Sequence, residues 1–422
     1  MKILIIGSGG REHAIAWKVS QNSSVEKIYC SPGNGGTALE SKCENIPLSK
    51  IDELVNFALK ESIDLTIVGP EVFLCEGIVD EFKNNGLKIF GPSKAAAKLE
   101  GSKSFAKDFM KKYGVKTPGY AVFDETKKAI NYLESCDYPV VIKADGLASG
   151  KGVVIANNKK EAEDTINAFI LDDIFKGSGK TVVIEEFLQG VEASILSITD
   201  GESIIPFISA KDHKKIFDGE KGPNTGGMGV IAPNPYCTEE VLEKFKKEIM
   251  EPTLKGIKEE NLDFTGIIFF GLMINQKGVY LLEYNVRMGD PETQAVLPLM
   301  KSDLVDLIEE ALNKKLDGFN IEWKDLSSCC VTLVSQGYPG EYKTGFPINI
   351  EEWESKECKN NEIKNFIAGA ALKDGELVTS GGRVVNVTSL GKSLQETRQK
   401  VYSNIEKVNF KGAYYRKDIG EI

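Results

Sequence analysis

Hydrophobic and polar positions along the first hundred residues follow a strand–helix–strand order. The run Lys2–Ile6 predicts a buried strand, and the pattern from Ala14 to Val19 predicts the helix that follows it. Further strands are expected at Lys27–Ser31, Leu65–Gly69 and Leu87–Gly91, with helices such as Ile51–Lys60 and Gly77–Asn84 between them. This spacing predicts a doubly wound parallel sheet.

Glycine-rich segments stand at the carboxyl ends of these strands, where open parallel sheets bind ligands. They are residues 7–11, 32–37, 69–71 and 91–93. A dinucleotide site is not expected, because Glu12 occupies the third glycine position of GxGxxG and no clear ribose-binding acid ends the second strand. The first turn is expected to hold one phosphate at a helix N-terminus beside Arg11, although a simple tight connection has the same pattern.

A hairpin in the middle of the chain is expected to close over phosphate. The strand Tyr138–Lys143 places a lysine among apolar residues, and the Gly/Ser-rich segment 144–152 with Lys151 leads to a second strand, Val153–Ala156. Backbone N–H groups of such a loop can bind phosphate oxygens. It is not a Walker A loop, since Gly152 stands where Ser or Thr is needed and a strand follows. A solvated hairpin tip is the alternative, which the apolar flanks of the lysine disfavour.

Helix and strand patterns continue on either side of this hairpin. Lys94–Lys112 predicts one long helix, and Thr181–Leu188 and Glu192–Asp200 predict strands. Two acids, an aromatic and a leucine end the first of these strands. That composition suits a site for adenine and ribose, but an ordinary strand end has it too.

Two polar segments lie near residue 220. Lys211–Lys215 is a charge cluster that is either solvated or part of a site, and His213 within it is interpreted as structural rather than as a general base. Residues 222–229, GPNTGGMG, are too glycine-rich for a core. We expect them to form a loop that approaches a ligand closely.

The stretch Tyr280–Gln294 carries the densest chemistry. Apolar residues alternate with Glu283, Asn285 and Arg287, so a strand places these three side chains on one face. A carboxylate, an amide oxygen and a guanidinium suit a divalent cation that itself binds phosphate. Gly289-Asp290-Pro291 then ends the strand and turns Asp290 toward the same place. The exposed polar face of an edge strand is the alternative.

Composition limits the class of protein. The 422 residues suggest three or four domains, and 41% hydrophobic with 27% charged residues is ordinary for a globular chain. A net charge of −10 argues against nucleic acid or an anionic membrane as partner, but not against small anionic substrates. We find no apolar run of membrane-spanning length and no signal peptide, so we expect a cytoplasmic protein. Eight scattered cysteines without a CxxC pair predict reduced thiols.

In this order and spacing the segments resemble the ATP-grasp superfamily, and more narrowly the glycinamide ribonucleotide synthetases of purine biosynthesis. The resemblance is carried by IIGSGGREHA, GPE at 69–71, GPSKAAAKLEGSKSFAKDFM, VIKADGLASGKGV, IEEFLQGVEAS, DHKK, GPNTGGMG, NVRMGDPETQ, GGRVVNVTSLG and YRKDIG. Met288 and Val286 depart from the usual family residues but lie between the liganding positions. The strand Gly266–Asn275 also lacks an acid that many ATP-grasp enzymes use to bind metal.

The resemblance implies an α/β and α+β multidomain fold with a two-lobed ATP-grasp core. We expect an N-terminal substrate-binding domain at 1–100, an ATP-grasp body at 101–120 and 189–325, a lid lobe at 121–188, and a small C-terminal capping domain at 326–422. After about Leu326 the residues themselves indicate no chemical constellation, only a cap that completes the active-site wall.

The implied activity is ATP-dependent ligation of glycine to 5-phosphoribosylamine through glycyl phosphate, with Mg²⁺ or Mn²⁺. The implied ATP-binding residues are Lys103, Lys143, Ser149, Gly150, Lys151, Glu185, Glu186, Phe187, Leu188, Glu192, Lys214, Lys215 and Asn224. The metal ligands are Glu283 and Asn285, and the catalytic residues are Arg287 and Asp290. The substrate-binding residues are Gly9, Gly10, Arg11, Gly33, Asn34, Gly226, Gly227 and Met228. We expect a monomer with at most transient contact with other pathway enzymes.

Two rival functions follow from the same scaffold. A carboxylating or formylating purine ligase would share the lobes but not GPNTGGMG together with RxGDPETQ. A non-catalytic nucleotide-binding regulator is disfavoured because Lys143, Glu283, Asn285 and Arg287 are all present.

Overall fold

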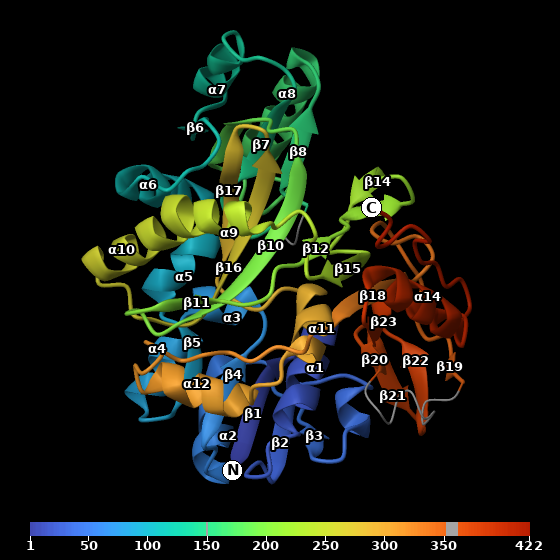
Figure 1. Ribbon diagram of the computed structural model, residues 1–422. Coiled ribbons are helices and arrows are strands. Elements are labelled where there is room, and N and C mark those ends of the chain that lie inside the picture. Colours follow the sequence, from blue (N-terminus) through green and yellow to red (C-terminus); the bar gives the residue numbers. More distant parts are fainter. Residues whose placement is uncertain (149–150, 352–361) are drawn as a thin grey trace.

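The computed structural model describes residues 1–148, 151–351 and 362–422. Figure 1 shows the N-terminal region at the bottom, a central body, a lid above it and the C-terminal region at one side. The arrangement confirms the α/β and α+β multidomain class expected from the sequence. Among the described helices, none is long and apolar enough to cross a membrane.

Five parallel strands of the largest sheet form the N-terminal region, in the order β5-β4-β1-β2-β3. Its elements are β1 (Lys2–Gly7), α1 (Gly10–Val19), β2 (Lys27–Pro32), η1 (Thr37–Leu39), β3 (Cys43–Asn45), α2 (Ile51–Glu61), β4 (Leu65–Val68), α3 (Glu71–Glu76), α4 (Ile78–Asn84) and β5 (Ile89–Pro92). Leu4 and Ile6 pack with residues of α2 and α4, whereas Ile3 and Ile5 pack with residues of α1. Helices on both faces explain why β1 is a continuous apolar run and confirm the doubly wound sheet.

The same sheet continues into the body through an antiparallel contact, in which Thr265 lies opposite Gly91. The body strands are β10 (Val191–Thr199), β11 (Ile204–Pro206), β16 (Phe264–Asn275) and β17 (Gly278–Asn285). Its helices are α5 (Lys94–Gly101), α6 (Lys103–Tyr113), α9 (Glu239–Phe245), η3 (Lys246–Met250), α10 (Glu251–Glu259), α11 (Glu292–Val296), η4 (Leu297–Leu299) and α12 (Leu304–Leu312).

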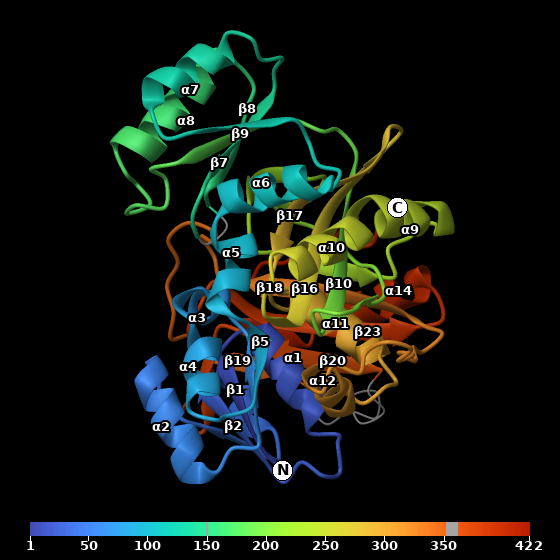
Figure 2. The same ribbon diagram turned by 90° about the vertical axis from the view of Figure 1, so that its left-hand side faces the viewer.

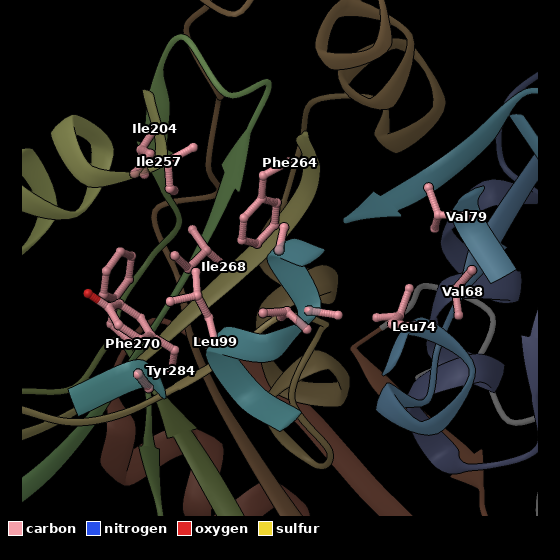
Figure 3. Close-up of a cluster of buried hydrophobic side chains, with 14 of the residues drawn as sticks. Val68, Leu74, Val79, Leu99, Ile204, Ile257, Phe264, Ile268, Phe270 and Tyr284 are labelled. Carbon is pink, nitrogen blue, oxygen red and sulfur yellow. The ribbon is translucent and has the colours of Figure 1, made fainter. Parts of the chain in front are cut away.

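A single apolar core joins the N-terminal region to the body. Figure 3 shows Val68, Leu74 and Val79 of the first region and Leu99, Phe264, Ile268 and Phe270 of the second, all members of one buried cluster. The shared sheet and the shared core hold the glycine-bearing strand ends of the N-terminal region in a fixed position relative to β17.

The single helix expected at Lys94–Lys112 is wrong, because it is broken at Ser102. The backbone of Ser102 is extended, with φ −142° and ψ 112°, and its hydroxyl accepts a hydrogen bond from Phe105 N at 3.2 Å. Serine is a strong N-cap, so a second helix, α6, begins at Lys103. Asp145 also accepts a hydrogen bond from Ser104 N at 2.7 Å, which ties the start of α6 to the base of the lid hairpin.

The lid is a four-stranded antiparallel sheet with its own core, in the order β6-β9-β7-β8. It comprises β6 (Tyr120–Phe123), α7 (Thr126–Leu133), β7 (Val140–Ala144), β8 (Val153–Ala156), α8 (Lys159–Ile166), η2 (Asn167–Leu171) and β9 (Val182–Glu186). Figure 2 shows it standing above α6 and β17.

The C-terminal region is built on a five-stranded sheet in the order β12-β15-β18-β23-β20. Its elements are β12 (Lys211–Asp212), β13 (Lys215–Phe217), β14 (Lys221–Asn224), β15 (Gly229–Ala232), β18 (Ser327–Val334), β19 (Ile348–Ile350), β20 (Ile363–Ile367), β21 (Ala370–Lys373), β22 (Glu376–Thr379), β23 (Arg383–Gly391), α14 (Leu394–Ile405) and β24 (Val408–Phe410). Because β12 and β15 precede residue 326 in the chain, this sheet crosses the expected boundary there. The loop expected at 222–229 is also partly wrong, since its first residues pair as β14 with β13.

Candidate active site

The carboxyl end of β17 presents three polar side chains in the alternation expected from the sequence. Glu283, Asn285 and Arg287 are partly exposed, whereas Tyr284 and Val286 between them are buried. The strand ends at Asn285, so Arg287 lies on the segment directly after it. A two-residue period therefore holds a carboxylate, an amide and a guanidinium in one row.

Two acidic side chains from other elements fix the position of Arg287. Its Nε lies 3.3 Å from Glu71 Oε2, and an Nη lies 3.1 Å from Glu100 Oε1. Another hydrogen bond of 3.1 Å reaches Asn285 Oδ1, and Glu100 also accepts from Val286 N at 2.7 Å. Burial alone would lower the pKa of Arg287, but Glu100 and Glu71 raise it above its ordinary value. The guanidinium is thus permanently charged and oriented.

Glu283 lies in a strongly positive environment. Burial alone would raise its pKa, but Lys143, Lys214, Lys103 and Arg287 together hold that pKa below its ordinary value. In the described part of the chain, no residue donates a hydrogen bond to its carboxylate. Lys103 and Lys214, expected at the nucleotide phosphates, therefore do face this row.

The donor set at Glu283 and Asn285 fits a hard divalent cation. An ionised carboxylate without a hydrogen-bond donor stands beside an amide oxygen on the same side of β17, and both are the oxygen ligands that Mg²⁺ takes. The described residues contain no group of three His, Cys, Asp or Glu side chains that could hold a metal by themselves. A cation here would therefore keep most of its shell for phosphate and water, as Mg²⁺ prefers.

Lys143, on the lid strand β7, is held by a buried carboxylate on the neighbouring strand β9. Its Nζ lies 3.1 Å from Glu185 Oε2 and donates to the carbonyl of Leu282 at 3.2 Å. Lys107 lies 3.3 Å from the other oxygen of Glu185, and burial lowers the pKa of Lys107 to about 8. The expected role of Glu185 at adenine or ribose is not supported, because its side chain is only 3% exposed and both of its oxygens face lysines.

This buried triad gives a prediction for stability. Replacing Glu185 by Gln leaves two buried lysines without a counter-charge and should destabilise the protein by about 3–5 kcal/mol. Lys107→Met should cost less, because Glu185 keeps Lys143 as a partner. The measurement is the midpoint of urea unfolding, with exposed Lys151→Met as the control; a Glu185→Gln midpoint equal to that of the parent would contradict the prediction.

The remaining lid residues separate into exposed and buried positions. Ser149 and Gly150, expected to bind phosphate, lie outside the described residues, and Lys151 beside them is exposed. Glu186, the last residue of β9, is exposed, and Leu188 beyond it is only 8% exposed. The half-buried Phe187 lies between them, on the connection from lid to body.

Glu192 and Lys214 form a pair at the edge of the body. Lys214 Nζ lies 2.8 Å from Glu192 Oε2, and chiefly Glu192 raises the pKa of Lys214. Lys215 follows in β13 and should point to the opposite face, and its carbonyl accepts a hydrogen bond from Arg416 at 3.0 Å. Asn224 lies across from Lys215 on β14 and is exposed. Of the two lysines, Lys214 is the one whose charge acts on Glu283.

A cavity of about 680 Å³ opens beside the end of β17, between the N-terminal and C-terminal regions. It is lined by Ser8, Gly9, Pro32, Gly33, Asn34, Ala38, Asn45, Asp290, Ala368, Gly369, Ala370, Ala371, Leu372, Ser380, Gly381 and Arg383. The sequence analysis found no chemical constellation in the C-terminal region and expected a cap that completes the active-site wall. The C-terminal region supplies half of the lining, including an arginine that the sequence analysis did not assign.

Arg383 connects this cavity to Asp290. One Nη lies 3.1 Å from Asp290 Oδ2, and the other donates to the carbonyls of Asp290 at 2.6 Å and Gly226 at 2.5 Å. Gln294 donates to Asp290 Oδ1 at 2.7 Å. Burial alone would raise the pKa of Asp290, but Arg383 and Arg11 hold it below its ordinary value. Asp290 is thus an ionised acid shared by the cavity and the strand end.

The carboxylate of Glu12 binds groups of the first glycine turn, residues 7–11. Glu12 accepts a hydrogen bond from Gly9 N and one from Arg11 Nε, the latter at 2.6 Å. Arg11 also donates to the carbonyl of Met288 at 3.1 Å and is buried, so it does not line the cavity. The expected contact between Arg11 and substrate phosphate is not supported; its charge acts on Asp290 from behind.

The other predicted substrate residues fall into two groups. Gly33 and Asn34 line the cavity, and Asn34 donates to the carbonyls of Ser8 at 2.9 Å and Ile367 at 2.8 Å, which joins the two regions. Met228 is fully buried, its N–H is bonded to His213 and its carbonyl to Thr332, so it has no group left for a substrate.

The backbone around residue 226 faces Arg383. Gly226 donates to Tyr338 Oη at 3.0 Å and its carbonyl accepts from Arg383. Gly227 has φ +117°, and a Cβ there would lie 2.4 Å from Pro291 Cδ, so only glycine fits. Gly10 is similarly close to the side chains of Asn386 and Gln294.

Comparison with known proteins decides the family. Three family profiles match consecutive parts of the chain: the phosphoribosylglycinamide synthetase N domain at residues 1–100, the ATP-grasp (A) domain at 101–293 and the C domain at 328–422. The chain belongs to the phosphoribosylglycinamide synthetase family. Members of this family are ATP-dependent ligases of purine biosynthesis.

Relatives of this family match the chain from end to end. The phosphoribosylamine–glycine ligase of Clostridium acetobutylicum is 64% identical over 422 residues, covering 100% of both chains. That of Fusobacterium nucleatum subsp. nucleatum is 58% identical over 423 residues, covering 100% of this chain and 99% of the other. The crystal structure of phosphoribosylamine–glycine ligase from Thermotoga maritima superposes with a TM-score of 0.86 at 35% identity, covering 99% of this chain and 100% of the other.

Several residues of this synthetase site escape sequence reasoning. Glu71 stands in a glycine-bearing strand end, which was a signal for the site but not for its contact with Arg287. Glu100, Lys107 and Gln294 sit on helices without any local pattern that separates them from ordinary polar positions. Arg383 lies in a segment that supported the family resemblance, and its role depends on a contact 93 residues away in the chain.

Proposed function

We propose that this chain joins glycine to 5-phosphoribosylamine, with ATP cleaved to ADP and phosphate, and yields glycinamide ribonucleotide. The observation that carries the proposal is the position of Asp290. Asp290 stands three residues after Arg287 and also lines the 680 Å³ cavity. The polar row of β17, where we place phosphoryl transfer, therefore shares one wall with a second substrate site.

The nucleotide is proposed to lie between the lid and the end of β17. Lys103, Lys143, Lys214 and the hairpin with Ser149, Gly150 and Lys151 face its phosphates. Phe187 and Leu188, with the backbone at Glu186, take adenine; Glu192 takes the ribose, near Asn224. Glu185 positions Lys143 from behind and does not touch the nucleotide.

Glu283 and Asn285 are proposed to hold Mg²⁺ or Mn²⁺. When bound, the cation neutralises phosphate charge and orients the triphosphate. The Arg287 guanidinium, fixed by Glu71 and Glu100, then faces the phosphoryl group with a fork that matches its oxygens.

The reaction is proposed to run in two steps. A carboxylate oxygen of glycine attacks the γ-phosphorus of ATP and ADP leaves, giving glycyl phosphate. The amine of phosphoribosylamine then attacks the acyl carbon and phosphate leaves. Two anions must meet in the first step, so the cluster of cationic side chains around Glu283 supplies the charge neutralisation that this step needs.

The cavity is proposed to hold phosphoribosylamine. Gly9, Gly33 and Asn34 form one wall, and Arg383, which donates to the carbonyl of Gly226, forms the wall nearest the acyl group; Gly10, Gly226 and Gly227 lie outside this lining. Water would destroy both glycyl phosphate and phosphoribosylamine, so the lid hairpin is proposed to close when ATP binds. A cytoplasmic location and a monomeric state remain predictions from the sequence.

A phosphate-release assay tests the proposed function. With ATP, Mg²⁺, glycine and freshly made phosphoribosylamine, we expect steady release that stops when either glycine or phosphoribosylamine is omitted. Release that responds to bicarbonate or formate in place of glycine would assign a different ligase. No release under any combination would leave only nucleotide binding.

A further inference from the structure

His13 is a buried, ionisable side chain that the proposed roles leave unused. It lies on α1, the helix after the first glycine turn, and is fully buried. Ile367 N–H donates to its Nδ1 at 2.8 Å, and its Nε2 lies 3.1 Å from Glu40 Oε1. Because Nδ1 accepts, the ring proton must be on Nε2, where it donates to Glu40. The imidazole thus joins Glu40 of the N-terminal region to the backbone of the C-terminal region.

Ile367 stands on the open edge of the C-terminal sheet, because β20 is the last strand in its order and pairs with β23. Both backbone groups of Ile367 bond away from β23: its N–H donates to His13, and its carbonyl accepts from Asn34 Nδ2 at 2.8 Å. An edge strand leaves such groups without a partner unless another part of the chain supplies one. Figures 1 and 2 show α1 beside β20. Two side chains of the N-terminal region therefore take the place of a neighbouring strand.

The same edge continues directly into one wall of the 680 Å³ cavity. Residues 368–372 follow Ile367 and line the cavity, and Asn34 lines it from the N-terminal region. Gly35 N–H donates to the carbonyl of Ala370 at 2.8 Å, so the two walls are joined again beyond Ile367. The distance between the two walls therefore depends on the hydrogen bonds made at Ile367 and Ala370.

The surroundings of His13 keep its ring neutral and oriented. Burial lowers the pKa of His13, and the carboxylate of Glu40 offsets that effect only in part. The ring of Phe366 packs edge-on against the imidazole, with the ring centroids 5.7 Å apart. On the other side, a Cβ at Gly36 would collide with the imidazole, so the backbone there packs directly against it. These contacts hold the acceptor Nδ1 toward β20.

We propose that His13 is a positioning residue for the second substrate: through Ile367 it holds the C-terminal wall of the cavity at the distance that phosphoribosylamine needs. The inference rests on the proposed function, which places phosphoribosylamine in this cavity. His13 does not itself line the cavity. Its loss should therefore weaken the binding of phosphoribosylamine and leave the nucleotide site at β17 as it is.

The test replaces His13 by two amides that each keep one of its contacts. His13→Asn places an amide oxygen near the position of Nδ1, so it can accept from Ile367 N–H but cannot reach Glu40. His13→Gln reaches Glu40 and leaves Ile367 N–H without a partner.

For His13→Gln we expect the KM for phosphoribosylamine to rise about ten-fold, the effect of one buried hydrogen bond left unmade, and for His13→Asn less than about threefold. The KM values for ATP and glycine should change less than about two-fold in both variants, because their sites do not share this contact. Gln399→Asn, at an exposed position of α14, is the matched control and should behave as the parent.

Each outcome decides the inference. Equal rises for the two variants, or a larger rise for His13→Asn, would mean that the bond to Ile367 does not position the wall. A rise in the KM for ATP as large as that for phosphoribosylamine, or loss of folding in both variants, would mean that His13 supports the fold as a whole. Any of these results overturns the proposal. Failure of the proposed function itself would appear separately, as absent turnover in the parent.

Discussion

Glu283→Gln is expected to abolish phosphate release at saturating ATP while leaving the fold intact. The substitution removes the only ionised oxygen ligand that the β17 row offers to a cation, and Gln also loses the charge that balances four surrounding cationic side chains. Because that carboxylate accepts no hydrogen bond from the described residues, its loss should not break the local structure. The measurement is the steady-state rate across a Mg²⁺ titration, together with the unfolding midpoint.

The control for this change is Glu259→Gln, an exposed acid on α10. It should retain the parent rate. Unchanged turnover of Glu283→Gln at saturating Mg²⁺ would remove Glu283 from the metal site.

Arg287→Lys is expected to lower kcat by about a hundred-fold, with a much smaller change in ATP affinity. Loss of one transition-state contact of this kind costs on the order of 3 kcal/mol. Lysine keeps the charge but not the planar fork, and that fork is oriented here by Glu71 and Glu100 at 3.3 and 3.1 Å. The effect should fall on kcat because the fork matches the transferring phosphoryl group best in the transition state.

Steady-state kinetics with ATP varied at saturating glycine separate the change in kcat from the change in ATP affinity. Arg398→Lys, on α14, offers the same exchange outside the site and should behave as the parent. A fall in kcat smaller than about threefold for Arg287→Lys would exclude Arg287 from the chemistry.

The local sequence pattern was sufficient to predict the strand β17 and the side of it on which its polar row lies. A strand period of two is set by backbone geometry, so the side on which Glu283, Asn285 and Arg287 lie follows from their spacing alone. The parallel sheet was predictable for the same reason, because a strand covered on both faces, such as β1, must be apolar throughout.

Contacts between distant segments were not predictable in this way. The C-terminal sheet recruits β12 and β15 from the preceding region, and only that pairing brings Arg383 to Asp290. Arg11 and Glu185 were assigned to ligands by their places in motifs that carry the family resemblance, whereas their partners in space, Glu12 for one and Lys107 for the other, turn them inward. Ser102 broke the expected helix because a capping hydroxyl outweighed the favourable residues on both sides.

The most direct test of the central claim is a crystal structure with Mg²⁺ and a non-hydrolysable ATP analogue. We expect Mg²⁺ about 2.1 Å from oxygens of Glu283 and Asn285, with Arg287 in hydrogen-bond contact with the γ-phosphate. A triphosphate bound elsewhere, with these three side chains turned to bulk solvent, would contradict the account.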